Sequence, residues 1–294
     1  MYVDGVFSGG GIKGFAIIGA HREIERRGFR FKRVAGTSAG SIMAALIAAN
    51  YTSEEIYQMI DELDLKSFLD ERKTYLPFNL TKWLLVYWRL GRYKGDELEK
   101  WVAHHLARRG IYKFSDLPPQ TLRVIASDLT NGQLVVLPDD LVKYGIDPGS
   151  FPVAKAIRMS CSLPYFFEPV KLYEGKSPNI IVDGGVLSNF PMWLFDQENV
   201  KKVRPVLGVK LSHSIIHSPK NKIKNAIQMY EALFETMKDA HDDRYISRKH
   251  AKNIVFIPTD GLLATEFEMT EEKKKELIQL GETYAKQFFS QWCY

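Results

Sequence analysis

The chain has 294 residues, of which 45% are hydrophobic and 26% charged, a composition that suffices for a large globular core. Its net charge is only +5, and acidic residues are interspersed among the basic ones, so we expect no nucleic-acid partner. The two cysteines, Cys161 and Cys293, are too few for a disulfide framework and lack metal-ligand spacing. We therefore expect a reduced, cytoplasmic protein without metal or cofactor, with peripheral attraction to an anionic membrane surface as an open addition.

The domain organisation predicted from the sequence is a single domain over residues 1–294. No run of 18 apolar residues is present, so no segment is expected to span a membrane, and the first residues form a strand pattern instead of a signal segment. No linker rich in Pro, Gly or Ser divides the chain. Residues 52–120 are interpreted as a helical cap or insertion within that domain.

The first 50 residues predict a strand, a helix, a second strand and a second helix. The pattern is strand-like over residues 2–7, and apolar residues recur at helical spacing over 14–27 until Gly28. A short strand at 33–35 precedes residues 41–50, which are apolar nearly all round and so predict a buried helix. This βαβα order predicts an α/β fold with a central, mostly parallel sheet sandwiched by helices.

The remaining chain continues to alternate between strand and helix patterns. Helices are expected from residue 52 onward with Glu54 and Glu55 in the first turn, and again over 95–109. The further strands are expected at 121–129, 133–137, 179–182, 203–211 and 253–257, and the further helices at 151–161, 222–249 and 270–292. On the helix at 222–249, the predicted apolar face is Ile223, Ile227, Tyr230, Phe234 and Met237.

Residues 75–94 are unusually aromatic. Two interpretations stay open: an interfacial lid whose aromatics meet acyl chains and whose cations meet headgroups, or a helical cap packed on the core. The aromatics are Tyr75, Phe78, Trp83, Tyr87, Trp88 and Tyr93, and the cations at the end are Arg89, Arg92 and Lys94.

The pentapeptide Gly36-Thr37-Ser38-Ala39-Gly40 is a G-x-S-x-G pattern between a predicted strand and a predicted buried helix. Such a pattern is typical of a nucleophile elbow, in which flanking glycines leave room for a strained serine turn. The alternative is that Ser38 only caps the helix. The glycine on each side of Ser38 favours the nucleophile.

A glycine loop, Gly9-Gly10-Gly11-Ile12-Lys13-Gly14, lies shortly before this serine. Backbone N–H groups at a helix start suit an oxyanion or a phosphate. The spacing also satisfies G-x-G-x-x-G, but no acidic residue follows at the end of the second strand to hold a ribose, and no Lys-Ser/Thr follows Gly14. An oxyanion loop is therefore the preferred interpretation, with a tight turn that binds nothing as the alternative.

The base that would activate the serine has two kinds of candidate. His213 and His217 follow a predicted strand and would complete a Ser-His-Asp carboxylesterase. Asp183 ends a buried strand before Gly184-Gly185, a typical setting for a functional residue at a sheet edge, although Asp-Gly is also common in plain turns. A non-catalytic protein that binds lipid or nucleotide is the alternative from a different class.

The motifs taken together resemble those of patatin-like phospholipases, in order and in spacing. The glycine loop resembles the family's oxyanion loop, and the pentapeptide at Ser38 is similar to its nucleophile elbow. Lys13 stands where the family often has Arg. The two other matching blocks are residues 156–164 (Ala156-Ile157-Arg158-Met159-Ser160-Cys161-Ser162-Leu163-Pro164) and Asp183-Gly184-Gly185 with Asn189 and Pro191.

This resemblance implies a Ser–Asp dyad that needs no histidine. Ser38 would be the nucleophile, Asp183 the base, and Gly9, Gly10 and Gly11 the oxyanion donors. The implied function is a lipid acyl hydrolase of phospholipase A or lysophospholipase type that acts on phospholipid or another acyl lipid. The residues expected to support the motifs are Lys13, Gly14, Gly36, Gly40, Gly184 and Gly185.

Overall fold

The computed structural model describes most of the chain. The described residues are 1–72, 86–174, 177–195, 204–212, 223, 229, 232–238, 246, 251–259, 265, 267 and 269–292. Within these residues no helix is both long enough and apolar enough to cross a membrane.

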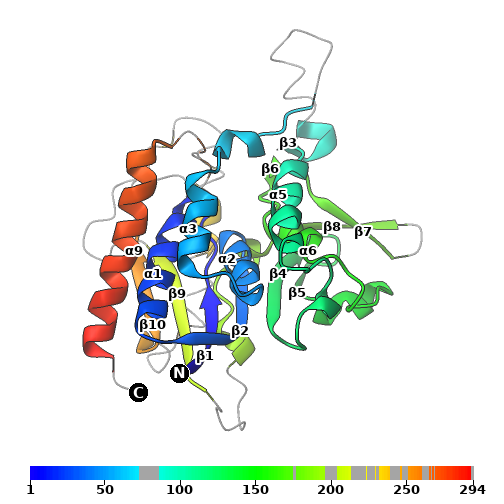
Figure 1. Ribbon diagram of the computed structural model, residues 1–294. Coiled ribbons are helices and arrows are strands. Elements are labelled where there is room, and N and C mark those ends of the chain that lie inside the picture. Colours follow the sequence, from blue (N-terminus) through cyan, green and yellow to red (C-terminus); the bar gives the residue numbers. More distant parts are fainter. Residues whose placement is uncertain are drawn as a thin grey trace.

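A mixed sheet forms the centre of the molecule, in the order β10-β9-β1-β2-β4-β8-β7, with β5 paired to β4 (Figure 1). The neighbours from β10 to β4 are parallel, whereas β8, β7 and β5 join antiparallel. The predicted mostly parallel α/β sheet is therefore confirmed. The strands are β1 (Tyr2–Phe7), β2 (Arg30–Thr37), β4 (Leu122–Asp128), β5 (Gln133–Leu137), β7 (Val170–Glu174), β8 (Ser177–Asp183), β9 (Val206–Ser212) and β10 (Ile254–Pro258).

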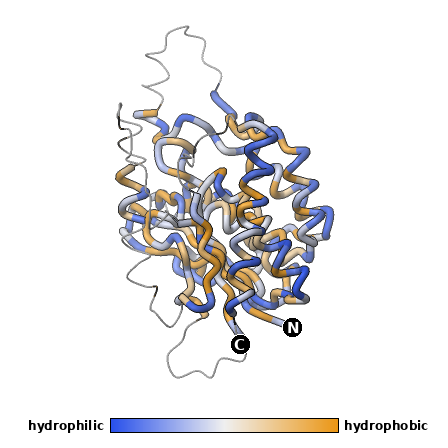
Figure 2. Tube along the Cα trace, turned by 90° about the vertical axis from the view of Figure 1, so that its left-hand side faces the viewer, coloured by the Kyte–Doolittle hydropathy of each residue, from blue (hydrophilic) through white to orange (hydrophobic). Residues whose placement is uncertain are grey.

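Helices flank this sheet. Helices α1 and α9 pack on each other beside β9 and β10, α2 lies on β1, β2 and β4, and α6 contacts β4 and β8. Figure 2 shows hydrophobic segments concentrated in the interior, while the outer helices alternate between hydrophobic and hydrophilic residues. The helices are α1 (Phe15–Arg26), α2 (Ala39–Ala48), α3 (Ser53–Asp61), α5 (Asp96–Ala107), α6 (Val153–Ser160) and α9 (Glu271–Gln291).

The two faces of the sheet have separate hydrophobic clusters. Phe7 and Val34 belong to the large cluster with the helices. Their neighbours Val6 and Ala35 point to the opposite face, where they pack in a second cluster with Phe190, Met192 and Phe195. This alternation follows from the two-residue period of a strand and places apolar residues of β1 and β2 on both faces of the sheet.

Strand β4 brings two distant parts of the chain together at one point of the sheet. β2 runs parallel to β4 until Thr37 pairs with Ile125, and β8 runs antiparallel until Asp183 pairs with Ala126, the next residue of β4. β5 occupies the other edge of β4 over the same residues. The ends of β2 and β8 therefore meet on one edge of β4, and Ser38 follows directly after this meeting point.

The structure also departs from the predicted elements. Two short paired strands, β3 (Gly91–Tyr93) and β6 (Tyr165–Phe167), and the edge strand β7 were not predicted. Each is short or lies at an edge, so tertiary pairing, and not sequence period, decides its conformation. Most of the predicted helix at 222–249 lies outside the described residues, as do residues 75–85 of the aromatic segment.

The described part of that aromatic segment is divided between surface and interior. Tyr87 and Trp88 are exposed, at 74% and 76% of their surface, whereas Tyr93 is buried. Arg92 pairs with Glu71 at 3.0 Å. Packing on the core therefore accounts for Tyr93, but it does not account for Tyr87 and Trp88.

Candidate active site

Ser38 occupies a strained turn between β2 and α2. Its φ of 52° and ψ of −127° lie where non-glycine residues are rare. The flanking glycines permit this turn, because a Cβ atom on Gly36 would lie 2.2 Å from the Gly40 carbonyl oxygen, and one on Gly40 would lie 2.3 Å from the Phe7 carbonyl oxygen. Gly36 and Gly40 thus pack closely around a strained strand-to-helix turn, and the role of Ser38 as a nucleophile stays a prediction.

Ser160, at the end of α6, holds this turn against the sheet. Its hydroxyl accepts the Ser38 backbone N–H at 2.9 Å and donates to the Ile125 carbonyl at 2.6 Å. The hydroxyl thereby bridges β2 and β4 at the point where the ladder between them ends. Ser41 adds a second support by donating its hydroxyl to the Ser38 carbonyl at 2.6 Å.

Asp183 lies beside Ser38 at the end of β8. The Gly185 N–H donates to Asp183 Oδ1 at 2.7 Å. Burial raises the pKa of Asp183 to about 6, although the nearby Ser38 hydroxyl and the Gly185 N–H lower it. The carboxyl group is therefore largely ionised at neutral pH, and it is a stronger base than an exposed aspartate.

The glycines after Asp183 leave little room for side chains. A Cβ atom on Gly184 would lie 2.3 Å from the Ile125 carbonyl oxygen, and one on Gly185 would lie 3.0 Å from Asp183 Oδ1. Gly184 therefore lets the turn after β8 pack against β4, and Gly185 leaves room for the Asp183 carboxylate.

The glycine loop forms a short 3₁₀ turn, η1 (Gly11–Gly14), that leads into α1. Gly10 and Gly11 line the same pocket as Ser38 and Asp183. Gly9 does not line this pocket, and its N–H donates to the Asn189 carbonyl at 3.2 Å. The expectation that Gly9 is an oxyanion donor is therefore corrected: a Cβ atom there would lie 2.4 Å from Asn189 Oδ1, so Gly9 is needed for space.

The other motif residues in this loop are buried or tightly packed. The Lys13 side chain is 5% exposed. A Cβ atom on Gly14 would lie 2.8 Å from the Cβ of Ala39, so this glycine sets the approach of the loop to α2. Of the two, only Gly14 lines the pocket.

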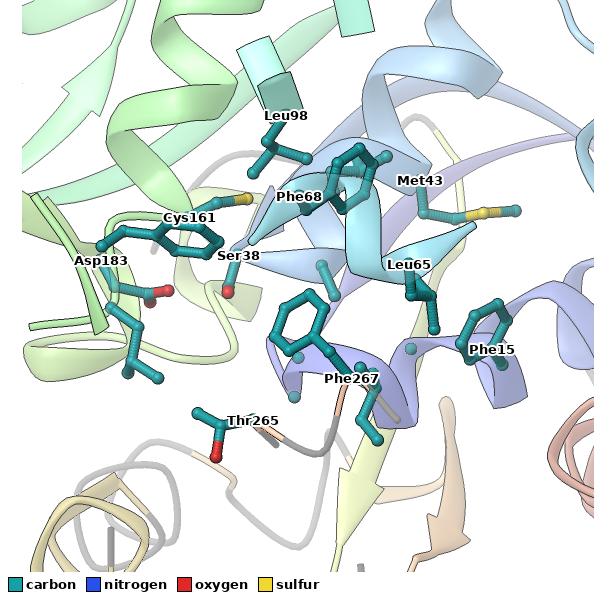
Figure 3. A pocket seen from close by; sticks show the side chains of 18 of the residues that line it. Phe15, Ser38, Met43, Leu65, Phe68, Leu98, Cys161, Asp183, Thr265 and Phe267 are labelled. Atoms are coloured by element: carbon teal, nitrogen blue, oxygen red, sulfur yellow. The ribbon is translucent and has the colours of Figure 1, made fainter. Parts of the chain in front are cut away.

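Ser38 and Asp183 open into a long, mostly apolar pocket (Figure 3). With its open mouth it encloses about 1110 Å³. Its walls come from α2, α3, the 3₁₀ turn η2 (Leu65–Phe68) and α5, so residues 52–120 supply much of the lining. Lining residues from these elements are Ile42, Met43, Leu46, Ile56, Ile60, Leu65, Phe68, Leu98 and Trp101.

The thiol of Cys161 lies in the same pocket. Burial raises its pKa to about 12, so it stays protonated at neutral pH. Its sulfur lies 3.9 Å from the Ser41 hydroxyl. Cys161 is therefore a small apolar neighbour of Ser38, not a competing nucleophile.

The pocket also receives side chains that sequence reasoning missed as site residues. Phe234, Glu235 and Lys238 come from the helical segment 232–238, and Thr265 and Phe267 from the chain after β10. Of the predicted apolar face, Phe234 lines the pocket, whereas Ile223 and Met237 are exposed. The amphipathic pattern signalled a helix here but not its nearness to Asp183.

The histidine candidates have different outcomes. His213 and His217 lie outside the described residues. Among the residues that the structure describes, no histidine lines the pocket. His21 is buried, and burial lowers its pKa to about 4, so it packs as a neutral ring elsewhere in the core.

Over the same described residues, no cluster of three or more His, Cys, Asp or Glu side chains forms a metal site.

The fold and the site define an α/β protein with a serine turn, a buried carboxyl group and a lipid-sized apolar pocket. The family model for "Patatin-like phospholipase" matches residues 5–196. The chain therefore belongs to the patatin-like phospholipase family, and this membership supports a lipid hydrolase activity.

Individual relatives agree with this assignment. The chain is 55% identical to the uncharacterized protein YqhO of Bacillus subtilis (strain 168) over the whole of both chains. It is 24% identical to the probable lipid hydrolase 463L of Invertebrate iridescent virus 6, over 69% of this chain and 68% of the viral one.

Solved structures show the same fold. VipD from Legionella pneumophila matches with a TM-score of 0.58 at 16% identity, over 99% of this chain and 67% of VipD. ExoU of Pseudomonas aeruginosa, in its complex with SpcU, matches with a TM-score of 0.55 at 20% identity, over 99% of this chain and 51% of the other. At these identities the likeness concerns the fold alone.

Proposed function

We propose that the protein hydrolyses carboxylic ester bonds of acyl lipids, with Ser38 as nucleophile and Asp183 as general base. The observation that carries this proposal is that the two side chains line one mostly apolar pocket, where the Ser38 hydroxyl is near enough to lower the pKa of the Asp183 carboxyl group. A nucleophile beside a base is the arrangement that covalent acyl transfer requires. Belonging to the patatin-like phospholipase family supports the same chemistry.

The reaction begins when Ser38 Oγ attacks the ester carbonyl carbon and Asp183 takes the hydroxyl proton. The N–H groups of Gly10 and Gly11, beside the pocket, are proposed to stabilise the tetrahedral oxyanion, and each such donor contributes about 3 kcal/mol in known enzymes. Asp183 then protonates the departing alcohol, which leaves an acyl-enzyme. Water activated by Asp183 attacks that acyl group and releases a fatty acid and free Ser38.

The substrate class follows from the pocket. Its walls are mostly apolar and suit the acyl chain of a phospholipid or another acyl lipid. The raised pKa of Asp183, about 6, keeps the base ionised at neutral pH while making it a better proton acceptor than an exposed aspartate. A histidine is not required for either proton transfer.

Labelling with a fluorophosphonate probe tests this assignment. We expect Ser38→Ala to abolish labelling and hydrolysis of p-nitrophenyl acyl esters, and Asp183→Asn to lower kcat by about 10³-fold or more because no base remains. In the wild-type protein, kcat/KM should fall about tenfold per pH unit below about 6, where Asp183 becomes protonated. Full activity in Asp183→Asn, with loss in a His213 or His217 variant, would favour a Ser-His-Asp triad instead.

We also propose peripheral contact with a lipid surface. Tyr87 and Trp88 are largely exposed and stack edge to face at 5.4 Å, and Leu90 close by is exposed as well. Aromatic side chains of this kind favour membrane interfaces. Co-sedimentation of Trp88→Ala with anionic liposomes should show weaker binding than the wild type, and unchanged binding by the folded variant would contradict the contact.

A further inference from the structure

An ion pair lies inside the otherwise apolar pocket, beside the proposed dyad. Glu235 and Lys238 both line the pocket, and Lys238 Nζ lies 2.5 Å from a Glu235 carboxylate oxygen. The Lys238 side chain is only 7% exposed. Among the described residues that line the pocket, Lys238 is the one that carries a positive charge.

This pair lies on the Asp183 side of the pocket. Phe234, one residue before Glu235, packs against the turn after Asp183, with a ring carbon 3.3 Å from where a Cβ on Gly185 would stand. Lys238 lowers and Glu235 raises the pKa of Asp183, so both charges lie within electrostatic range of the carboxyl group. The acyl pocket formed by α2, α3 and α5 has no comparable charged pair among its described lining residues.

Stability alone does not explain this arrangement. Burying an ion pair costs about as much desolvation as the charges regain, so such pairs add little net stability. In ligand pockets, by contrast, a few charged groups in an apolar lining fix the orientation of the polar part of the ligand. A lysine in the pocket that holds Ser38 and Asp183 can meet an anionic group carried by the ester substrate.

We propose that Lys238 binds a phosphate oxygen of the substrate's headgroup while the ester lies at Ser38, and that Glu235 orients the ammonium group for it. This inference rests on the proposed hydrolase function. It makes Lys238 a specificity-determining residue for acyl lipids that carry a phosphate, supplied by a segment outside the residues that match the family model. The positive charge of Lys238 would attract the phosphate, and it also lies close enough to Asp183 to lower the pKa of this base.

The test compares two substrates that differ only in the phosphate: 1-decanoylglycerol and 1-decanoylglycerol 3-phosphate. Wild-type protein should prefer the phosphorylated ester in kcat/KM. Lys238→Met should lower kcat/KM for the phosphorylated ester by about 10- to 100-fold, the usual worth of a charge-assisted hydrogen bond, and change the neutral ester little. Lys238→Arg should keep the preference, because it keeps the positive charge.

The chain offers a matched control on α9. Glu271 and Lys274 form the same i,i+3 ion pair at 2.7 Å, with a Lys274 side chain that is 6% exposed, but neither residue lines the pocket. Lys274 donates to the Leu63 carbonyl instead. Lys274→Met should therefore leave the ratio of the two kcat/KM values at its wild-type level, whatever it does to stability.

The other outcomes separate the two proposals. If Lys238→Met slows both esters equally, the lysine acts only through Asp183, and phosphate recognition is overturned while the hydrolase assignment stands. If inorganic phosphate at constant ionic strength inhibits both esters equally, and only when Lys238 is present, the site takes free phosphate and the headgroup role is overturned. If wild-type protein cleaves neither ester and no probe labels Ser38, both proposals fail.

Discussion

Pairs of glycines make two close backbone contacts in this protein, and the two contacts have different roles. At the elbow, Gly36 and Gly40 let β2 and α2 approach closely around Ser38. Between α1 and α9, a Cβ atom on Gly19 would lie 1.8 Å from the Ile278 carbonyl oxygen, and one on Gly281 would lie 1.8 Å from the Ala16 carbonyl oxygen. Close backbone approach alone therefore does not mark a functional site.

The difference lies in what accompanies the glycines. Gly36 and Gly40 lie next to Ser38, which has a positive φ, and near the buried carboxyl group of Asp183, whose pKa is raised. The strained turn and the buried charge each cost folding free energy. Both glycines of the helix pair lie within regular α-helix. Substitutions that relieve the strain at Ser38 or the buried charge of Asp183 should therefore raise stability, whereas substitutions in the helix contact should only lower it.

The largest effect is expected in the helix contact. Gly281→Ala should destabilise the protein by about 3 kcal/mol or more, because the new methyl group would overlap the Ala16 backbone, which cannot move like a side chain. This outcome runs against helix propensity, by which alanine would gain about 1 kcal/mol over glycine. Urea unfolding measures the free energy directly.

Activity then separates the two glycine pairs. Folded Gly281→Ala should keep its kcat per active site, whereas Gly36→Ala should lose both stability and activity because Ser38 is displaced. Gly149→Ala is a control for the substitution itself, since the nearest atom to a Cβ there is 3.5 Å away. Equal loss of activity in Gly36→Ala and Gly281→Ala would remove the distinction between the two contacts.

A second prediction concerns the buried charge. The pKa of Asp183 is raised in the fold, from 3.8 to about 6, so the stability it contributes is fully present below pH 3.8 and is lost as pH rises through about 6. Asp183→Asn stays neutral at every pH. It should therefore be more stable than the wild type at pH 8, by about 2–3 kcal/mol, and equal to it near pH 3.5.

Asp116 offers a control of opposite sign. Backbone N–H groups of Lys113 and Tyr112 lower the pKa of this exposed carboxylate, so its contribution is present above its unfolded pKa and is lost as pH falls. Asp116→Asn should therefore destabilise the protein at pH 8. Thermal melts across the pH range compare both variants, and a pH-independent difference at Asp183 would show that this group does not titrate near pH 6.

The elbow and the helix contact also differ in how well they are predicted from sequence. Ser38, Gly36 and Gly40 are recognisable because a strained turn imposes residue types at fixed local spacing. Gly19 and Gly281 lie in no such local pattern, because the backbone atoms that a Cβ atom on each would overlap belong to the other helix. The same holds for Ser160, whose bond to the Ser38 N–H spans 122 residues, and for Lys238.

Asp183 lies between these extremes. Its place at the end of a buried strand before two glycines was readable, but its nearness to Ser38 depends on the antiparallel register of β8 on β4. At Gly9 the motif position predicted an oxyanion donor, but the Gly9 N–H already donates to the Asn189 carbonyl. Local motifs thus predicted which residues matter more reliably than what each backbone group does.

The smallest predicted effect tests the strain at Ser38 itself. Glycine adopts positive φ without the penalty that a Cβ atom brings, so Ser38→Gly should be about 1 kcal/mol more stable than Ser38→Ala, although both are inactive. At Ser41, inside α2, the order should reverse, because both variants lose the same hydroxyl and alanine is the better helix former. Chemical denaturation of the four variants measures both differences. Equal stability of Ser38→Gly and Ser38→Ala would show that the turn at Ser38 is not strained. The buried carboxyl group of Asp183 would then be the remaining difference between the elbow and the helix contact.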